Sequence, residues 1–196
     1  MKNRLNSMHP SQVLVMGFIA LIIVGSILLS MPQASVTGIS IGSVDALFTS
    51  TSAVCVTGLV VLDTGTAFTL FGQIVILILV QCGGLGFMSL ASLIFLLIGK
   101  KITLRERILI KESLNELTIS SVVRLVKIVL IVTFSIELIG AVILSFRFIP
   151  EFGISAGIYR SVFHSISAFC NAGFDIMGGF KSFSNYVADP LINLTF

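Results

Sequence analysis

The sequence predicts an all-α, polytopic membrane protein built from repeated units of long helix, short helix, polar loop and long helix. Of its 196 residues, 56% are hydrophobic and 11% are charged, whereas soluble domains carry about 25% charged residues. No lysine or arginine occurs between Leu5 and Gly99, and the mean hydropathy is +1.10. This composition excludes a soluble enzyme domain, a secreted disulfide scaffold and a disordered tail.

Three apolar segments are long enough to cross a bilayer as helices, which takes about 20 residues. They cover residues 11–31, 69–98 and 121–148, and the last should end before Pro150. The second segment is longer than the hydrocarbon core requires, so it must tilt or bend. Its glycine-rich centre, residues 81–86, predicts a kink or a close contact between helices.

Positive charge gathers between the second and third segments, at Lys100, Lys101, Arg105, Arg107 and Lys111. Cytoplasmic loops carry an excess of lysine and arginine, so this linker and the N-terminus are predicted to be cytoplasmic. The result is a multi-pass chain in the cell membrane. The net charge of +3 reflects this topology, and nucleic-acid binding is not expected. The linker is also a candidate for contact with lipid headgroups or a regulatory subunit.

A moderately apolar segment, residues 43–56, lies between the first two spans and is too short to cross the membrane. It is rich in serine and threonine, and Ser43 and Asp45 mark its start as a helix. A segment of this length between two spans is typical of a re-entrant or interfacial helix.

An internal repeat supports this interpretation. Residues 48–58 read FTSTSAVCVTG and residues 163–173, which lie 115 positions later, read FHSISAFCNAG, with six of eleven positions identical. Both copies follow a span on the outer side, so the repeat is parallel and an inverted-repeat transporter is disfavoured. The repeat divides the chain into a first unit, residues 1–98, a cytoplasmic linker, residues 99–120, and a second unit, residues 121–196, which lacks its closing helix.

The repeated loop has a physical meaning in a membrane. Selection of an ion requires oxygen ligands in place of its hydration shell, and irregular backbone is tolerated at membrane depth where it lines an aqueous cavity. A short helix followed by an extended strand can direct carbonyl oxygens toward a central axis. The closing glycines, Gly58 and Gly173, can adopt dihedral angles that other residues avoid. The alternative is that both glycines only cap helix C-termini.

The loops CVTGL, residues 55–59, and CNAGF, residues 170–174, resemble the Trk/Ktr/HKT superfamily of cation transporters, as do the repeated spans and the basic linker. The similarity is closest to the membrane subunits of bacterial Ktr potassium-uptake systems. It implies helix–pore-loop–helix units as in potassium channels, four of them around one potassium pathway. The residues that it implies for the selectivity filter are Val56, Thr57, Gly58, Asn171, Ala172 and Gly173.

The resemblance further implies potassium uptake across the bacterial cell membrane. The implied assembly is a homodimer on a cytosolic ring of nucleotide-binding regulatory subunits, in contact with membrane lipids. Potassium is then the cargo, no resident cofactor is implied, and sodium dependence is left open. Two filter loops instead of four indicate an N-terminal fragment of a longer protein, so a gating loop of the third repeat lies outside this sequence.

Two polar residues in apolar surroundings have competing interpretations. Glu137 lies in the third span and is a candidate for an ion path or for cation-coupled secondary transport. Its alternative is a structural polar contact with Arg124, Lys127 or a cation on another helix. His164 is a candidate proton relay or metal ligand, but no further ligand has suitable spacing, which favours packing or hydrogen bonding. No constellation typical of a membrane enzyme occurs, so no enzymatic activity is predicted.

Four of the acidic residues in the outer connections, Asp45, Asp63, Asp175 and Asp189, have two interpretations. They either raise the cation concentration at the outer mouth or only solubilise the loops. The sequence leaves both interpretations open.

Overall fold

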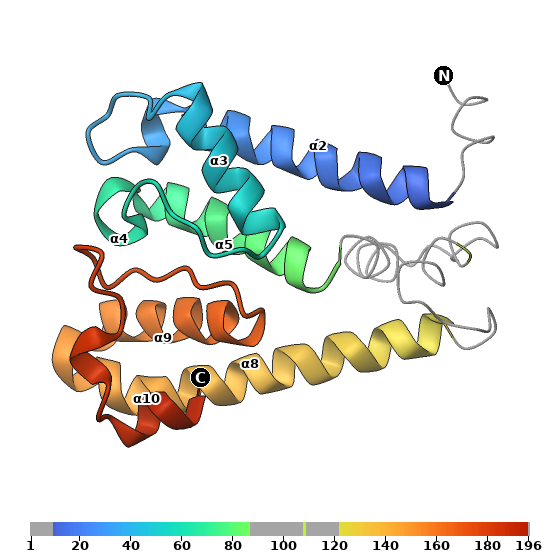
Figure 1. Cartoon of the computed structure of the whole chain (residues 1–196). Helices are drawn as coiled ribbons and strands as arrows, with labels where there is room; N and C mark the ends of the chain where they lie inside the picture. Colours follow the sequence, from blue (N-terminus) through green and yellow to red (C-terminus); the bar gives the residue numbers. More distant parts are fainter. Residues whose placement is uncertain (1–9, 87–107, 109–121, 196) are drawn as a thin grey trace.

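The computed structural model describes residues 10–86, 108 and 122–195 (Figure 1). This part of the chain is helical, and its only extended pairing is one isolated bridge between Ser35 and Phe68. The predicted all-α class is confirmed. The basic linker, apart from residue 108, lies outside the described residues. The elements are α2 (Pro10–Ser30), η1 (Pro32–Ala34), α3 (Ser43–Val54), α4 (Thr64–Ala67), α5 (Leu70–Gly84), α8 (Val122–Phe152), α9 (Ile154–Phe169), η2 (Ser184–Tyr186) and α10 (Pro190–Thr195).

Two described stretches, Gln12–Ser30 in α2 and Val126–Phe152 in α8, are long and apolar enough to cross a membrane. α2 matches the first predicted span to within one residue at each end. On its outer face Ile19, Ile23 and Ile27 are at least half exposed. A row of exposed isoleucines is unfavourable in water and suits contact with lipid.

The prediction that the third span ends before Pro150 is wrong. α8 continues to Phe152, with Pro150 inside its last turn. Proline removes one backbone N–H and crowds the turn that precedes it, and few residues follow it here. The N–H of Gly153 donates to the carbonyl of Ile149 at 2.9 Å, which closes the turn beyond the proline. Gly153, at φ +82°, lies at the end of the helix.

The helix α5 follows the second predicted span only as far as Gly84. Gly86, at φ +74°, has left the helical conformation, and residues 87–98 lie outside the described part. A Cβ atom added to Gly83 would collide with the carbonyl oxygen of Val54 at the end of α3. The glycine-rich segment therefore makes the predicted close contact between helices.

The short helices α3 and α9 end part of the way along the long ones. In Figure 1 both start in the left part of the molecule, where α2 and α8 end, and after each the chain returns to the left. α3 begins at Ser43, as predicted, and ends at Val54. α9 ends at Phe169, which lies 115 residues later, so the two copies end in register. This backbone path is the one expected of re-entrant helices.

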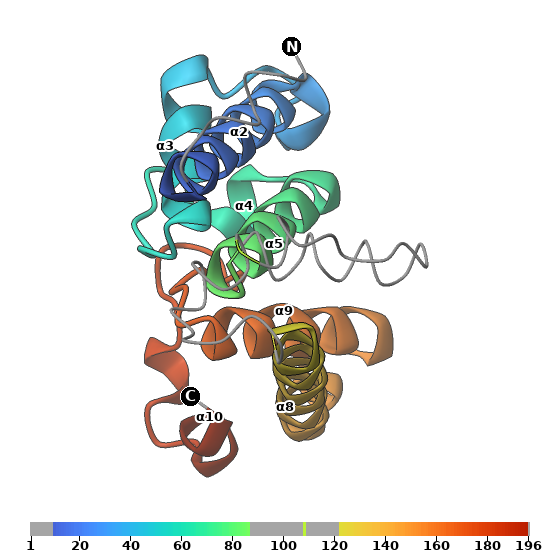
Figure 2. The same ribbon diagram turned by 90° about the vertical axis from the view of Figure 1, so that its right-hand side faces the viewer.

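The short helices pack beside the long helices of their own unit. Figure 2, turned by 90°, views α2, α5 and α8 nearly end on, and α3 contacts α2 and α5 while α9 contacts α8. The main core includes Leu29, Val54, Ile76, Phe163 and Phe174, from both units. A smaller cluster joins α8 to η2 and α10. The shared core holds the loops that follow α3 and α9 next to each other.

Candidate functional site

The chain leaves α3 and α9 through the same turn. After α3, the N–H of Val56 donates to Ala53 at 3.2 Å and the N–H of Thr57 donates to Ser52 at 2.9 Å. The second copy makes both bonds 115 residues later, at 2.9 and 2.8 Å. Val56 (φ +55°) and Asn171 (φ +52°) take the left-handed conformation. These paired bonds around a left-handed residue are the Schellman motif of helix C-termini.

The alternative that Gly58 and Gly173 only cap the helices is therefore wrong. Val56 and Asn171 occupy the left-handed cap position, and the glycines follow two residues later at φ +73° and +70°. A β-branched valine at positive φ is strained, and such strain concentrates at functional sites. The glycines consequently need an explanation other than capping.

The two loops meet at these glycines. A Cβ atom on Gly58 would lie 2.8 Å from the carbonyl oxygen of Ala172 and 3.2 Å from the Cα atom of Gly173. A Cβ atom on Gly173 would lie 3.2 Å from the Cα atom of Gly58. The backbones come this close because neither residue has a side chain.

The carbonyl oxygens of the predicted filter residues are free of hydrogen-bond donors from the part of the protein that the structure describes. Within the described residues, no hydrogen bond reaches the carbonyls of Val56, Thr57, Gly58, Asn171, Ala172 and Gly173. The carbonyl that follows them in the second loop is occupied, because the hydroxyl of Ser167 donates to Phe174 at 2.5 Å. Carbonyl oxygens without a donor require water or a cation.

A cavity of about 240 Å³ adjoins the second loop. Ser167, Asn171, Gly173, Asp175 and Ser182 contribute to its lining. This mixture of hydroxyl, amide, carboxylate and backbone groups suits water or a hydrated cation.

Each short helix is seated on the preceding span by an equivalent contact. The hydroxyl of Ser50 donates to a backbone carbonyl of α2 at 2.8 Å, and that of Ser165 donates to one of α8 at 2.6 Å. Gly25 and Gly140 lie directly under these hydroxyls, where a Cβ atom would collide with them. The repeat thus extends to the contact between short helix and span.

Two glycines at the end of α5 contact both loops. Gly83 lies against the carbonyl of Val54, and a Cβ atom on Gly84 would lie 2.6 Å from the Sγ atom of Cys170. Val54 lies two residues before the first filter segment, and Cys170 directly precedes the second. The end of α5 therefore separates and positions the starts of both loops.

Glu137 links the two units. Its Oε1 atom accepts a hydrogen bond of 2.7 Å from Nε2 of Gln81 in α5, and Oε1 of Gln81 accepts a longer one of 3.6 Å from the thiol of Cys170. Only 6% of Glu137 is exposed. Among the described residues its partner is thus an amide, and the expectation of Arg124, Lys127 or another cation is wrong. The contact favours the structural interpretation of this acid.

His164 is a hydrogen-bonding residue of α9, in agreement with the favoured interpretation. It is fully buried, its Nδ1 atom lies 2.8 Å from the carbonyl oxygen of Arg160, and its Nε2 atom lies 3.1 Å from the N–H of Ile176. No group of three or more His, Cys, Asp or Glu side chains in the described segments is arranged to hold a metal ion.

Asp63 joins the outer connections of the two units. Its Oδ1 atom accepts bonds from the N–H groups of Gly65 (2.8 Å) and Thr66 (3.0 Å), which caps α4, and its Oδ2 atom accepts one from Phe180 (2.6 Å). Asp175 likewise accepts from a backbone N–H. These carboxylates stabilise the loops by accepting hydrogen bonds from backbone N–H groups. The sequence did not predict this role, because the N–H groups belong to turns whose geometry is not visible in the sequence.

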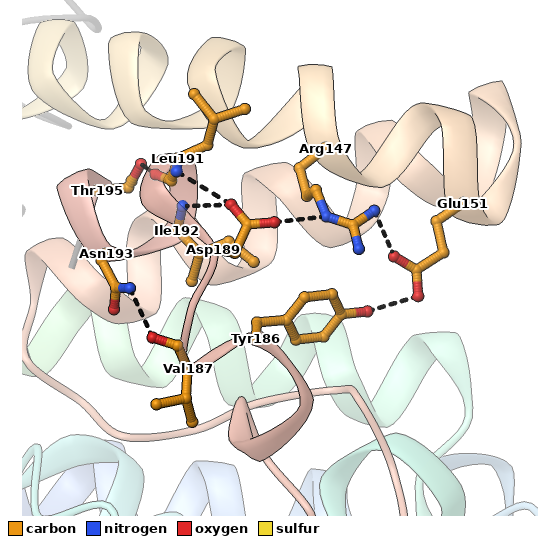
Figure 3. A network of polar contacts seen from close by, with 9 residues as sticks. All are labelled: Arg147, Glu151, Tyr186, Val187, Asp189, Leu191, Ile192, Asn193 and Thr195. Carbon is orange, nitrogen blue, oxygen red and sulfur yellow. Dashed lines mark hydrogen bonds and ion pairs between the residues drawn. The ribbon is translucent and has the colours of Figure 1, made fainter.

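A polar network holds the start of α10 against α8 (Figure 3). Arg147 pairs with Asp189 at 2.6 Å and with Glu151 at 2.8 Å, and the hydroxyl of Tyr186 donates to Glu151 at 2.7 Å. Burial and then the bond to Glu151 raise the pKa of Tyr186 to about 12. Burial acts to raise the pKa of Asp189, but the hydrogen bonds from Arg147 and from two backbone amides outweigh it and lower the pKa. Asp189 is therefore also engaged inside the protein.

Residues 1–196 match the protein family TrkH, described as cation transport protein. The chain belongs to the TrkH family. It is therefore a membrane protein of a transport family, which points away from an enzyme.

Three curated relatives are similar to this TrkH chain over most of its length. Ktr system potassium uptake protein B of Bacillus subtilis (strain 168) is 51% identical over 185 residues, which cover 94% of this chain and 41% of the relative. Potassium/sodium uptake protein NtpJ of Enterococcus hirae is 47% identical over 179 residues, 91% of this chain and 40% of the relative. Ktr system potassium uptake protein B of Vibrio alginolyticus is 44% identical over 186 residues, 94% of this chain and 40% of the relative. The TrkH chain spans about two-fifths of the length of these relatives.

Proposed function

We propose that the protein carrying this chain takes up potassium across the bacterial cell membrane through a pore. The residues proposed for its selectivity filter are Val56, Thr57, Gly58, Asn171, Ala172 and Gly173. The observation that carries the proposal is the meeting of two loops with the same turn and with carbonyl oxygens that accept no hydrogen bond from the described residues. Such oxygens can replace the hydration shell of a cation. The names of the relatives, which specify potassium or potassium and sodium, support potassium as the cargo.

The organisation predicted from the sequence forms part of the proposal. Residues 1–98 form a first helix–pore-loop–helix unit, residues 99–120 form a cytoplasmic linker, and residues 121–196 form a second unit that lacks its closing helix. The N-terminus is cytoplasmic. The parallel course of α2 and α8 supports this topology, as does the short helix after each, beyond which the chain returns to the end where the short helix began. As partners we infer a second copy, membrane lipids and a cytosolic nucleotide-binding ring.

Cation-coupled secondary transport through Glu137 has less support. A coupling acid must exchange its proton or ion during transport, whereas this carboxylate is buried and bound by Gln81. A contact between two helices explains an acid in this position without transport.

The uptake itself is testable in a bacterium that lacks its own potassium-uptake systems. The complete protein in which these residues occur should restore growth at low external potassium and produce saturable uptake of K⁺. Addition of Na⁺ during the uptake measurement determines sodium dependence. Cells with the empty vector are the control. Protein present in the membrane without any cation flux would contradict the proposed function.

The topology predicts opposite accessibility of two cysteine substitutions. In a variant without Cys55, Cys82 and Cys170, Ile39→Cys should react with an impermeant thiol reagent from outside, and Arg105→Cys only from the cytoplasm. Ile39 is suitable because 72% of it is exposed, whereas the nearby Asp63 is nine-tenths buried. Labelling of Arg105→Cys from outside would reverse the orientation.

A further inference from the structure

The segment after the second filter loop, residues 174–176, is held by one face of α9. The guanidinium of Arg160 donates to the carbonyl of Ile176 at 2.8 Å, and the N–H of Ile176 donates to Nε2 of His164 at 3.1 Å. Ser167 binds Phe174 from the same helix. The three side chains lie four and three residues apart, so they share a helix face. Both polar atoms of Ile176 are thus occupied by α9.

His164 has one orientation and one tautomer in this arrangement. Its Nε2 atom accepts from a backbone N–H, so the ring proton is on Nδ1 and donates to the carbonyl of Arg160. The rings of Phe148, Phe163 and Phe183 surround it at centroid distances of 5.7, 5.6 and 4.9 Å. A fully buried ring with two hydrogen bonds cannot rotate without breaking both, so the segment after the loop is held rigidly.

The first loop lacks this arrangement. Shifting by 115 residues places Asp45 at the position of Arg160 and Thr49 at that of His164. The hydroxyl of Thr49 is buried and makes no hydrogen bond to the residues that the structure describes, and Val61, which corresponds to Ile176, is 44% exposed. In the described residues, the side-chain hydrogen bonds of α3 go to α2, to its own backbone and to Thr57, and none reaches the segment after Gly58. The two copies of the repeat therefore hold the equivalent segments after their filter loops differently.

We propose that His164 and Arg160 are positioning residues that fix the donor-free carbonyls of residues 171–173 through Ile176. The inference rests on the proposed function, because it assigns these residues a role in ion affinity. Among the described residues, the hydrogen bond that joins His164 to the segment after the loop runs from the N–H of Ile176 to Nε2, so the acceptor at Nε2 is the group that matters. A variant that keeps this acceptor keeps the position of the loop.

Glutamine and asparagine separate this role from simple packing. The amide of His164→Gln reaches the place of Nε2 and can accept from the N–H of Ile176, whereas that of His164→Asn reaches only the place of Nδ1. In the complete protein, His164→Asn should raise the KM for K⁺ about tenfold with little change in maximal rate, since a buried N–H is left unpaired. His164→Gln should stay within about twofold of the unsubstituted protein. Thr49→Val is the matched control in α3 and should leave the KM unchanged, because its hydroxyl has no partner.

Hydrogen exchange tests the same inference without transport. The amide of Ile176 should exchange faster in His164→Asn and remain protected in His164→Gln. Equal exchange and equal KM values in the two variants would overturn the proposal and leave His164 as a packing residue. If the protein transports no cation but the two variants still differ in exchange, the proposed function is wrong. The hydrogen-bonded support of the segment after the loop is then still correct.

Discussion

Replacing Gly58 by serine is expected to lower the ratio of K⁺ to Na⁺ affinity about tenfold while the protein still folds. At φ +73° a residue with a Cβ atom is disfavoured by about 1–2 kcal/mol. The new Cβ atom would also lie 2.8 Å from the carbonyl oxygen of Ala172. The loop must therefore shift, and the spacing of its oxygens, on which discrimination between the two ions depends, must change with it. Uptake KM values for both ions provide the measurement.

Gly38 offers a control with the same backbone conformation. It lies in an outer connection at φ +70°, and a Cβ atom added there would have no neighbouring atom within 4 Å. Gly38→Ser should cost similar conformational energy but leave the affinity ratio unchanged. Gly173→Ser, at φ +70°, should act like Gly58→Ser because the two glycines meet. If the filter variants keep the ratio of the unsubstituted protein, the filter assignment is wrong.

The internal repeat made the arrangement of the loops predictable from sequence. Ser50 and Ser165 make the same contact between a short helix and the preceding span. Because this contact is made twice, its small residues recur at the same spacing in the sequence. The short helix of residues 43–54 was predictable for a related reason, because its length cannot cross a bilayer. Most of the fold was therefore predictable from the lengths of the apolar segments and from the spacing of the repeat.

The sequence could not predict contacts between the units. Glu137 was expected to pair with a cation, but Gln81 lies 56 positions away and meets it only after the helices pack. The left-handed conformation of Val56 could not be predicted either, since valine rarely adopts positive φ. Gly58, two residues later, is the residue for which a sequence predicts a left-handed cap. The end of α8 beyond Pro150 depended on a bond made by Gly153. Each of these features is set by tertiary packing or by a neighbour's backbone.

Replacement of Gly83 by alanine is expected to destabilise the protein by about 1–3 kcal/mol, the usual effect of overpacking. Alanine favours a helix by about 1 kcal/mol over glycine, so propensity alone predicts the opposite sign. The added methyl group would collide with the carbonyl oxygen of Val54, and it would lie 2.8 Å from the carbonyl carbon of that residue. Backbone cannot rotate away as a side chain can. The end of α3, and with it the first loop, must move.

Gly84→Ala is the matched comparison, because it adds the same methyl group at the next position of the same helix. Its new Cβ atom meets the side chain of Cys170, at 2.6 Å from Sγ and 2.9 Å from Cβ. The thiol can rotate away, and the contact with Cβ requires a smaller shift than the collision of Gly83 with a backbone carbonyl. The melting temperature of the purified protein should therefore fall more for Gly83→Ala than for Gly84→Ala, and maximal potassium uptake should fall in the same order. An equal or higher melting temperature for Gly83→Ala would mean that helix propensity dominates at this position. In that case the contact between α5 and α3 does not position the first loop.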